Sequence, residues 1–131
     1  NQVPVVALAG DGGFLMTGNE LATAAQQGLN LTCVVFDNSL YGTIRLHQAR
    51  EYPGRISGTE LWSPDFVRLA EAFGGLGVRV ERNQDIAGAV QAALAHPGIS
   101  LVSVAVDPET IAVGTSLAAT ERTSTSSSVH L

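Results

Sequence analysis

The stretch "LAGDGGFLMTGNELATAAQQGLNLTCVVFDNSLYG", residues 8–42, contains the end of one short apolar run and the whole of a second, and each run is followed by oxygen-bearing side chains. The first run, Val3 to Ala9, stops at Gly10-Asp11-Gly12. The second, Leu29 to Phe36, stops at Asp37-Asn38-Ser39. Short apolar runs bounded by turn residues are typical of buried strands. Ligands of an open parallel sheet bind at the carboxyl ends of its strands, so we expect one binding site at these two ends.

A helix is expected between the two strands. Gly12 and Gly13 permit a sharp backbone turn. Thr17 and Glu20 match the capping-box pattern T-x-x-E, which predicts a helix starting near Gly18. Gly28 is a typical residue after a helix end. The stretch therefore predicts a strand–turn–helix–strand unit.

The rest of the chain continues the alternation. Ser63-Pro64-Asp65 predicts a helix start with Ser63 as the cap and Pro64 in the first position. The expected elements are a short helix over 41–50, an irregular segment over 51–62, a helix over 63–73, a strand over 77–80, a helix over 83–95 and a strand over 99–106. This order predicts an α/β fold, a parallel sheet flanked by helices on both faces.

Composition narrows the class of protein. The 131 residues are 45% hydrophobic and 15% charged, which is typical of a globular domain. A net charge of −5 with only 7 basic residues argues against a nucleic-acid partner. The single cysteine, Cys33, excludes a disulfide within the chain and a cysteine-rich zinc site. No apolar run reaches the length of about 18 residues that spans a membrane, so we expect a cytoplasmic protein without a membrane partner.

Residues 1–113 are expected to form one domain and the Ser/Thr-rich residues 114–131 a loose tail. The chain starts without methionine and enters a strand almost at once, which suggests a fragment of a longer polypeptide.

The two strand ends suit a magnesium ion bound together with phosphate. Asp11 offers a carboxylate oxygen and Asn38 an amide oxygen. A bend in the backbone just after Asn38 would present a carbonyl oxygen as well, and we expect it to be that of Leu40. Three protein oxygens suit Mg²⁺, which usually keeps phosphate and water oxygens as further ligands. Gly12 and Gly13 lack side chains, so their N–H groups can approach a phosphate closely.

Gly10-Asp11-Gly12, followed by 25 residues (13 to 37) and then Asn38, resembles the cofactor-anchoring motif of thiamine-diphosphate-dependent enzymes. The whole stretch is most similar to the acetolactate-synthase-like branch, which includes decarboxylases and carboligases of 2-oxo acids. The resemblance implies that Asp11, Asn38 and the Leu40 carbonyl ligate Mg²⁺. It implies a cofactor site made of Gly10, Asp11, Gly12, Gly13, Asn38, Leu40, Tyr41 and Gly42.

The resemblance also implies partners outside this chain. A pyrimidine-binding domain, from the same or a partner subunit, would carry the activating glutamate, so the chain alone is expected to be inactive. A homodimer or tetramer acting on a small 2-oxo acid is implied. Two positions differ from the branch patterns: His47 stands where acetolactate synthases usually have Trp, and Arg45 stands where pyruvate-decarboxylase relatives have Glu.

Two alternatives remain open. Gly10-Asp11-Gly12 also starts the dinucleotide-binding pattern G-x-G-x-x-G, and Asp37 ends the next strand, where a ribose-binding acid is expected. Leu15 occupies the sixth position, which that pattern reserves for a small residue. The second alternative is a non-catalytic interaction module that keeps the fold.

Overall fold

The computed structural model describes residues 3–112, 115–120 and 122. The chain divides into two compact units. The first unit comprises Asn1–Asp37 and Ser63–Val106, and the second comprises Asn38–Trp62 and Asp107–Leu131. Each unit is described by itself.

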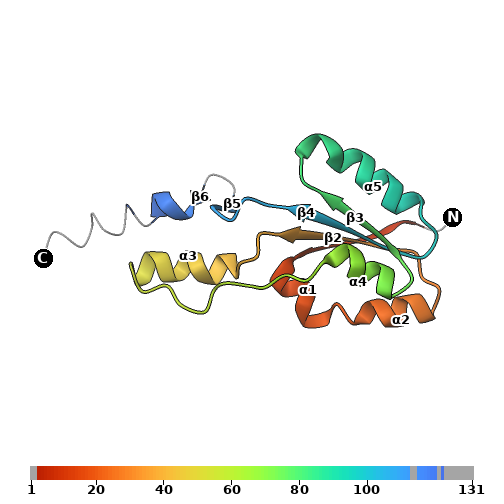
Figure 1. Ribbon diagram of the computed structural model, residues 1–131, viewed down its shortest axis with the longest axis horizontal. Coiled ribbons are helices and arrows are strands. Elements are labelled where there is room, and N and C mark those ends of the chain that lie inside the picture. The colour runs from red at the N-terminus through yellow and green to blue at the C-terminus, as the bar shows by residue number, and fades with distance from the viewer. Residues whose placement is uncertain (1–2, 113–114, 121, 123–131) are drawn as a thin grey trace, which may run out of the picture. The chain divides into compact units, whose positions relative to one another are not determined.

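A four-stranded parallel sheet forms the centre of the first unit (Figure 1). Its strands are β1 (Val5–Gly10), β2 (Leu31–Asp37), β3 (Leu76–Val80) and β4 (Ile99–Ala105), in the order β1-β2-β4-β3. Gly10 pairs with Phe36, and Asp37 pairs with Ala105. The strands that carry the two predicted ligand segments are therefore neighbours, and they end side by side.

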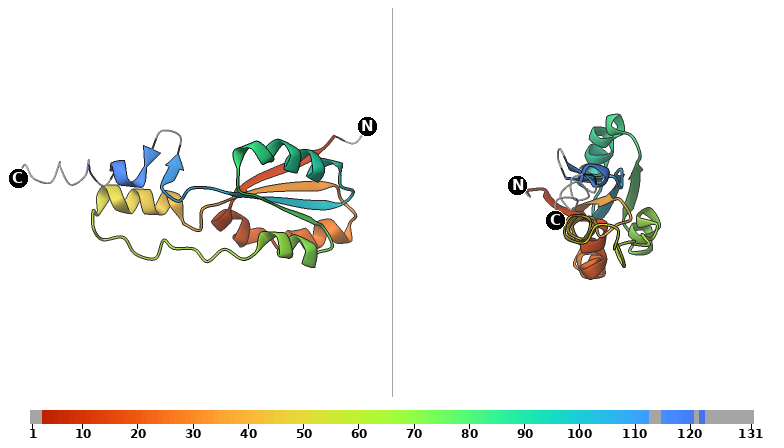
Figure 2. Two further views of the ribbon diagram at one scale, coloured as in Figure 1. Left: turned by 45° about the horizontal axis from the view of Figure 1, so that its top comes forward. Right: turned by 90° about the vertical axis from the view of Figure 1, so that its left-hand side faces the viewer.

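Helices cover both faces of this sheet (Figure 2). Helices α1 (Asp11–Thr17), α2 (Glu20–Gln26) and α4 (Phe66–Ala72) lie on one face, and α5 (Ile86–Ala95), preceded by the 3-10 turn η1 (Asn83–Asp85), lies on the other. The first core contains Phe14, Leu21, Ala24, Cys33, Val35, Phe66, Ala70, Ile99 and Leu101. The second contains Val34, Val80, Ala89, Ala93, Val102 and Val104. The predicted α/β fold is confirmed.

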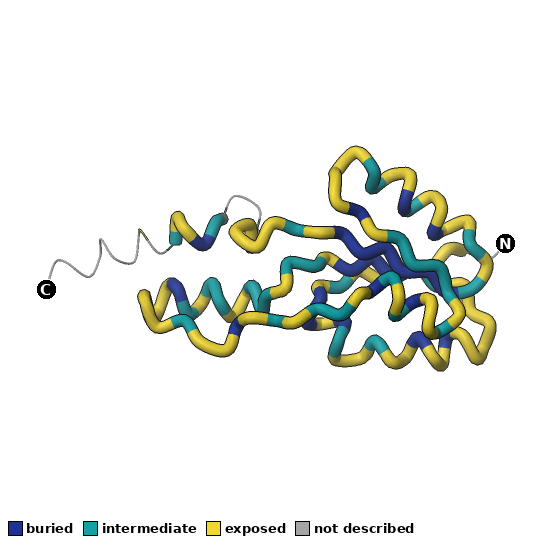
Figure 3. Tube along the Cα trace, in the orientation of Figure 1, coloured by how far each residue is buried: buried dark blue, intermediate teal, exposed yellow. Residues whose placement is uncertain are grey.

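Burial is concentrated in the inner strands, as Figure 3 shows. The apolar run at Val3 to Ala9 was expected to be buried, and this expectation is wrong for most of its side chains. Val5, Val6 and Leu8 are 58%, 44% and 70% exposed. The reason is that β1 lies at the edge of the sheet. Helix α5 packs mainly against β3 and β4, so it leaves β1 largely uncovered.

The predicted turn at Gly12-Gly13 is also wrong, because both glycines lie in the first turn of α1, which begins directly after β1. Thr17 is the last residue of α1 and does not cap α2, whose N-cap is Asn19. The early helix start places Phe14, 7% exposed, in the core. Packing of this ring outweighs the low helix propensity of two glycines.

The second unit contains α3 (Gly42–Glu51) and a small antiparallel pair, β5 (Thr110–Ala112) with β6 (Thr115–Ser116). The helix agrees with the short helix predicted over 41–50. Of the tail predicted from residue 114, only 115–120 and 122 are described, and Thr115–Ser116 form β6 within it. The boundary at 113 and residues 123–131 lie outside the described residues, so the predicted domain limit stays a prediction. In the part of the chain that the structure describes, no helix combines the length and apolarity needed to cross a membrane.

Candidate functional site at the ends of two neighbouring strands

Asp11 is the first residue of α1 and follows the last residue of β1. Its side chain is buried, with 3% of the residue exposed. Oδ1 of Asp11 accepts the N–H of Gly12 at 2.8 Å. A buried carboxylate is costly unless hydrogen bonds or a metal ion compensate for the lost water. Asp11 therefore has the burial and the chemistry of a metal ligand.

A second carboxylate and a hydroxyl lie at the same edge of the sheet. Asp37 ends β2, and the hydroxyl of Ser63 donates to its Oδ1 at 2.8 Å. The same Ser63 hydroxyl lies 3.4 Å from Oδ2 of Asp11. Neither residue was expected at a magnesium site: Asp37 was expected only as a ribose-binding acid in the dinucleotide alternative, and Ser63 was expected to cap a helix.

Ser63 is not the cap of α4, and that prediction is wrong. Asp65 caps the helix, because its Oδ1 accepts the N–H groups of Val67 and Arg68 at 3.0 and 3.2 Å. Both residues are good N-caps by type, but only one can stand directly before the first helical residue, Phe66. The hydroxyl of Ser63 is consequently available to the carboxylates.

In the second unit, the backbone bends just after Asn38, as expected. Ser39 has a φ of 54°, in the left-handed region that non-glycine residues rarely adopt. Oδ1 of Asn38 accepts the N–H of Leu40 at 3.1 Å, and Leu40 forms a β-bridge with Glu60. Asn38 and Leu40 are thus fixed by local hydrogen bonds and by pairing to a neighbouring segment.

The predicted cofactor glycines differ in their surroundings. A Cβ added at Gly10 or Gly13 would meet no atom within 4 Å, so open space adjoins both residues. The N–H of Gly12 already donates to Asp11. Tyr41 precedes the first residue of α3, Gly42, where an added Cβ would lie 3.3 Å from Nδ2 of Asn38.

Within the described ranges, no three His, Cys, Asp or Glu side chains group closely enough to hold a metal ion on their own. A soft-metal or histidine-rich centre is therefore not built from these residues. A carboxylate, an amide oxygen and a backbone carbonyl form the donor set that hard cations such as Mg²⁺ select. By donor type, Asp11 of the first unit and Asn38 and Leu40 of the second each fit this cation.

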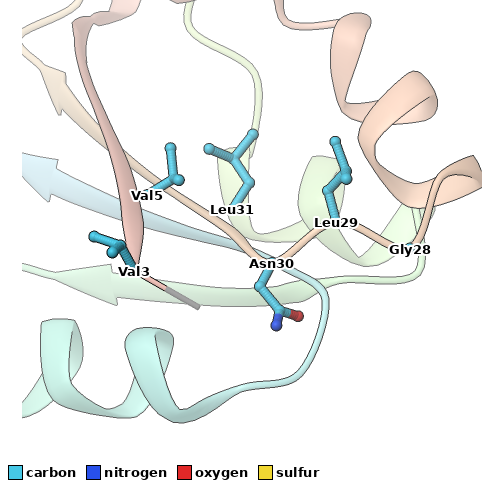
Figure 4. Close-up of a pocket in the computed structure, with 6 residues that line it drawn as sticks. All are labelled: Val3, Val5, Gly28, Leu29, Asn30 and Leu31. Atoms are coloured by element: carbon cyan, nitrogen blue, oxygen red, sulfur yellow. The ribbon is translucent and has the colours of Figure 1, made fainter. Parts of the chain in front are cut away.

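An apolar groove of about 410 Å³ lies at the opposite, amino-terminal ends of the strands, beside the first residues of β1 and β2. Figure 4 shows the side chains of Val5, Leu29 and Leu31 on one side of the strands and that of Asn30 on the other. The groove lacks the charged groups that a diphosphate requires. It is therefore not part of the candidate site.

Residues 1–104 match the family model described as thiamine pyrophosphate enzyme, C-terminal TPP binding domain. The chain belongs to this family. The match confirms the resemblance carried by Gly10-Asp11-Gly12 and Asn38, and it favours that interpretation over a dinucleotide-binding domain.

Relatives of the chain include acetolactate synthases and a benzoylformate decarboxylase. An acetolactate synthase of Mycobacterium avium is 37% identical over 126 residues, which are 88% of this chain and 20% of that protein. The acetolactate synthase isozyme 2 large subunit of Escherichia coli K12 is 36% identical over 79% of this chain and 19% of that protein. The crystal structure of benzoylformate decarboxylase from Polynucleobacter necessarius superimposes with a TM-score of 0.74 at 31% identity, over 81% of this chain and 20% of the other. The chain spans about a fifth of the length of these relatives.

The two positions that differ from the branch patterns both lie on α3. Nη1 of Arg45 donates to Oγ1 of the buried Thr59 at 3.2 Å. His47 Nδ1 lies 3.1 Å from Nη2 of Arg50. Arg45 therefore has a structural partner within its own unit, and His47 is exposed beside Arg50.

Proposed function

We propose that this chain binds the diphosphate of thiamine diphosphate through Mg²⁺, as one part of a cytoplasmic enzyme that acts on a small 2-oxo acid. The observation that carries the proposal is the buried carboxylate of Asp11 at the end of β1, beside the end of β2, from which the chain continues directly into Asn38. Asp11, Asn38 and the carbonyl of Leu40 are the proposed metal ligands. The open space at Gly10 and Gly13 is where we place the diphosphate.

Membership of the family supports the proposed reaction. Thiamine diphosphate, when bound, supplies the electron sink for decarboxylation of the 2-oxo acid, and the product is protonated or ligated to a second carbonyl. The residues of this chain hold the charged end of the cofactor and orient it. The activating glutamate is proposed to come from a pyrimidine-binding domain of the same or a partner subunit, so the isolated chain is expected to be inactive. The assembly is proposed to be a homo-oligomer.

Calorimetric titration of the full-length protein with Mg²⁺ at saturating thiamine diphosphate tests the proposal. Loss of an outer hydrogen-bond partner of a metal ligand typically weakens metal affinity about 10- to 100-fold. Because Asp11 is a proposed ligand itself, we expect Asp11→Asn to weaken the apparent Mg²⁺ affinity by at least this much. The matched control is Asp107→Asn, because the exposed Asp107 carboxylate can be replaced by an amide that still accepts the N–H of Glu109. Unchanged binding in Asp11→Asn contradicts the proposed ligand set.

A chelator distinguishes the non-catalytic alternative. Binding of thiamine diphosphate is expected to disappear in EDTA and to return with added Mg²⁺. A protein that still binds its protein partners, but whose behaviour changes with neither the chelator nor the cofactor, would be an interaction module.

A thermal-shift assay tests the dinucleotide alternative. Stabilisation by NAD instead of thiamine diphosphate would support that alternative, because only a ligand of the native state raises the melting temperature.

A further inference from the structure

Ser63 stands where three segments of the first unit meet. It precedes α4, and its hydroxyl lies between the end of β2, at Asp37, and the start of α1, at Asp11. The residue is half-buried. The hydroxyl is thus within hydrogen-bond distance of a carboxylate from each of the two neighbouring strand ends.

The position of Ser63 is fixed from the helix side. Asp65 caps α4 through two backbone N–H groups. Phe66, 1% exposed, packs edge to face against Phe14 of α1 at 5.6 Å between ring centroids. Ser63 lies two residues before this cap, and the helix is anchored by both contacts. Its hydroxyl therefore occupies a defined place at the carboxyl ends of the strands.

The chemistry of one hydroxyl between two carboxylates is asymmetric. A serine hydroxyl has a single proton, so it donates to one carboxylate at a time. The 2.8 Å distance identifies Asp37 as the acceptor in this structure, and the 3.4 Å distance leaves Oδ2 of Asp11 at the limit of the interaction. Oδ1 of Asp11 accepts the N–H of Gly12, and the Ser63 hydroxyl lies beside Oδ2, so the two groups flank this carboxylate.

Carboxylates that bind metals are themselves hydrogen-bonded, and these outer partners set their orientation. We propose that Ser63 is a positioning residue of the magnesium site, which it serves by fixing the carboxylate of Asp37 and, next to it, that of Asp11. This inference rests on the proposed function, because it takes Asp11 as a metal ligand. It adds Ser63, from the segment before α4, to the residues at the two strand ends.

The test uses the full-length protein, titrated calorimetrically with Mg²⁺ at saturating thiamine diphosphate. Ser63→Ala is expected to weaken the apparent Mg²⁺ affinity about tenfold, the lower value for loss of an outer partner. Ser63→Thr keeps the hydroxyl and is expected to restore the affinity. The control is Ser57→Ala, because Ser57 is exposed and its recorded hydrogen bonds to Gln48 involve backbone atoms.

A double-mutant cycle separates positioning from general support of the fold. Asp37→Ala removes the acceptor of the Ser63 hydroxyl, so Ser63→Ala is expected to cost much less in that background than in the wild type. Additive losses would overturn the proposal. Two further results together would also overturn it: a loss of stability in Ser63→Ala measured without ligands, and a Ser63→Thr variant that does not regain the Mg²⁺ affinity.

Parallel measurement of Asp11→Asn separates the two proposals. If Asp11→Asn loses Mg²⁺ affinity while Ser63→Ala binds like the wild type, the role of Ser63 is refuted and the proposed function stands. If Asp11→Asn binds like the wild type, the proposed function fails and the role of Ser63 fails with it.

Discussion

The ring of Phe14 in α1 meets the ring of Phe66 in α4 edge to face, with centroids 5.6 Å apart and an interplanar angle of 81°. Both residues are buried, at 7% and 1% exposure. The pair joins the helix that begins with Asp11 to the helix that follows Ser63. The packing of one core therefore supports two of the segments that form the candidate site.

Phe66→Ala tests how much this packing stabilises the protein. Removing a fully buried aromatic ring costs about 3–5 kcal/mol, because apolar burial is lost and a cavity remains. We expect a loss of this size in the free energy of unfolding by urea, followed by circular dichroism. Trp62→Ala is the matched control: its side chain is 86% exposed, so the expected change stays within about 0.5 kcal/mol.

Gly77 in β3 provides a second test, because it lies directly against α4. A Cβ added at Gly77 would come within 2.5 Å of the carbonyl oxygen of Val67 and 2.6 Å of its Cα. Backbone atoms cannot rotate away, so Gly77→Ala is expected to displace α4 and to lower the unfolding free energy by about 1–3 kcal/mol.

Gly88→Ala is the control for this substitution. Gly88 lies inside α5, and an added Cβ would meet no atom within 4 Å. Alanine is favoured over glycine in helices by about 0.5–1 kcal/mol, so this variant is expected to gain stability. Equal effects of the two substitutions would contradict the close approach of β3 to α4.

Much of the fold could be predicted from local pattern. The strands were recognised because apolar runs such as Leu29 to Phe36 are short and end at turn residues. The alternation with helices then indicated a parallel sheet. Strand order and edge positions depend on contacts between distant segments, so the pattern could not show that β1 is an edge strand with an exposed Leu8.

The candidate site was predicted only in part, for a similar reason. Asp11 and Asn38 stand in a recognisable motif at strand ends, so sequence spacing was enough to select them. Ser63 lies 52 residues from Asp11 and 26 from Asp37, and its own neighbours resemble a helix start. No local signal indicates that its hydroxyl reaches two carboxylates; only the tertiary packing of α4 against α1 reveals it.

Cys33 allows a test of pH dependence. The thiol lies in β2 and is buried, and this burial raises its pKa above the ordinary value because the thiolate is disfavoured away from water. A raised folded-state pKa contributes stability fully below the unfolded pKa, and this contribution is lost as pH rises. Stability is therefore expected to fall above about pH 8.5, the ordinary thiol pKa, and Cys33→Ala is expected to reduce this alkaline loss.

Thiol labelling provides the corresponding kinetic measurement. The thiolate is the reactive form, so Cys33 is expected to react with a disulfide reagent at pH 8 much more slowly in the folded protein than in urea. Peptide mapping identifies the labelled site. Rapid labelling of Cys33 under native conditions would contradict its burial in the sheet.

Gly42→Ala tests Asn38, a proposed metal ligand that belongs to the second unit. An added Cβ would lie 3.2 Å from Cδ1 of Ile111 and 3.3 Å from Nδ2 of Asn38, closer than ordinary van der Waals contact. The isoleucine methyl and the asparagine amide must each move by a few tenths of an ångström. Because Asn38 is a proposed ligand, we expect the apparent Mg²⁺ affinity of the full-length protein to fall severalfold in calorimetric titration.

The double variant Gly42→Ala with Ile111→Val shows which neighbour matters. Valine lacks the Cδ1 atom, so the double variant is expected to regain thermal stability through relief of one of the two close contacts. The contact with Asn38 persists, and the loss of Mg²⁺ affinity is expected to persist with it. Recovery of both properties would show that the effect arises from Ile111 alone, and it would remove the support that this substitution gives to Asn38 as a ligand.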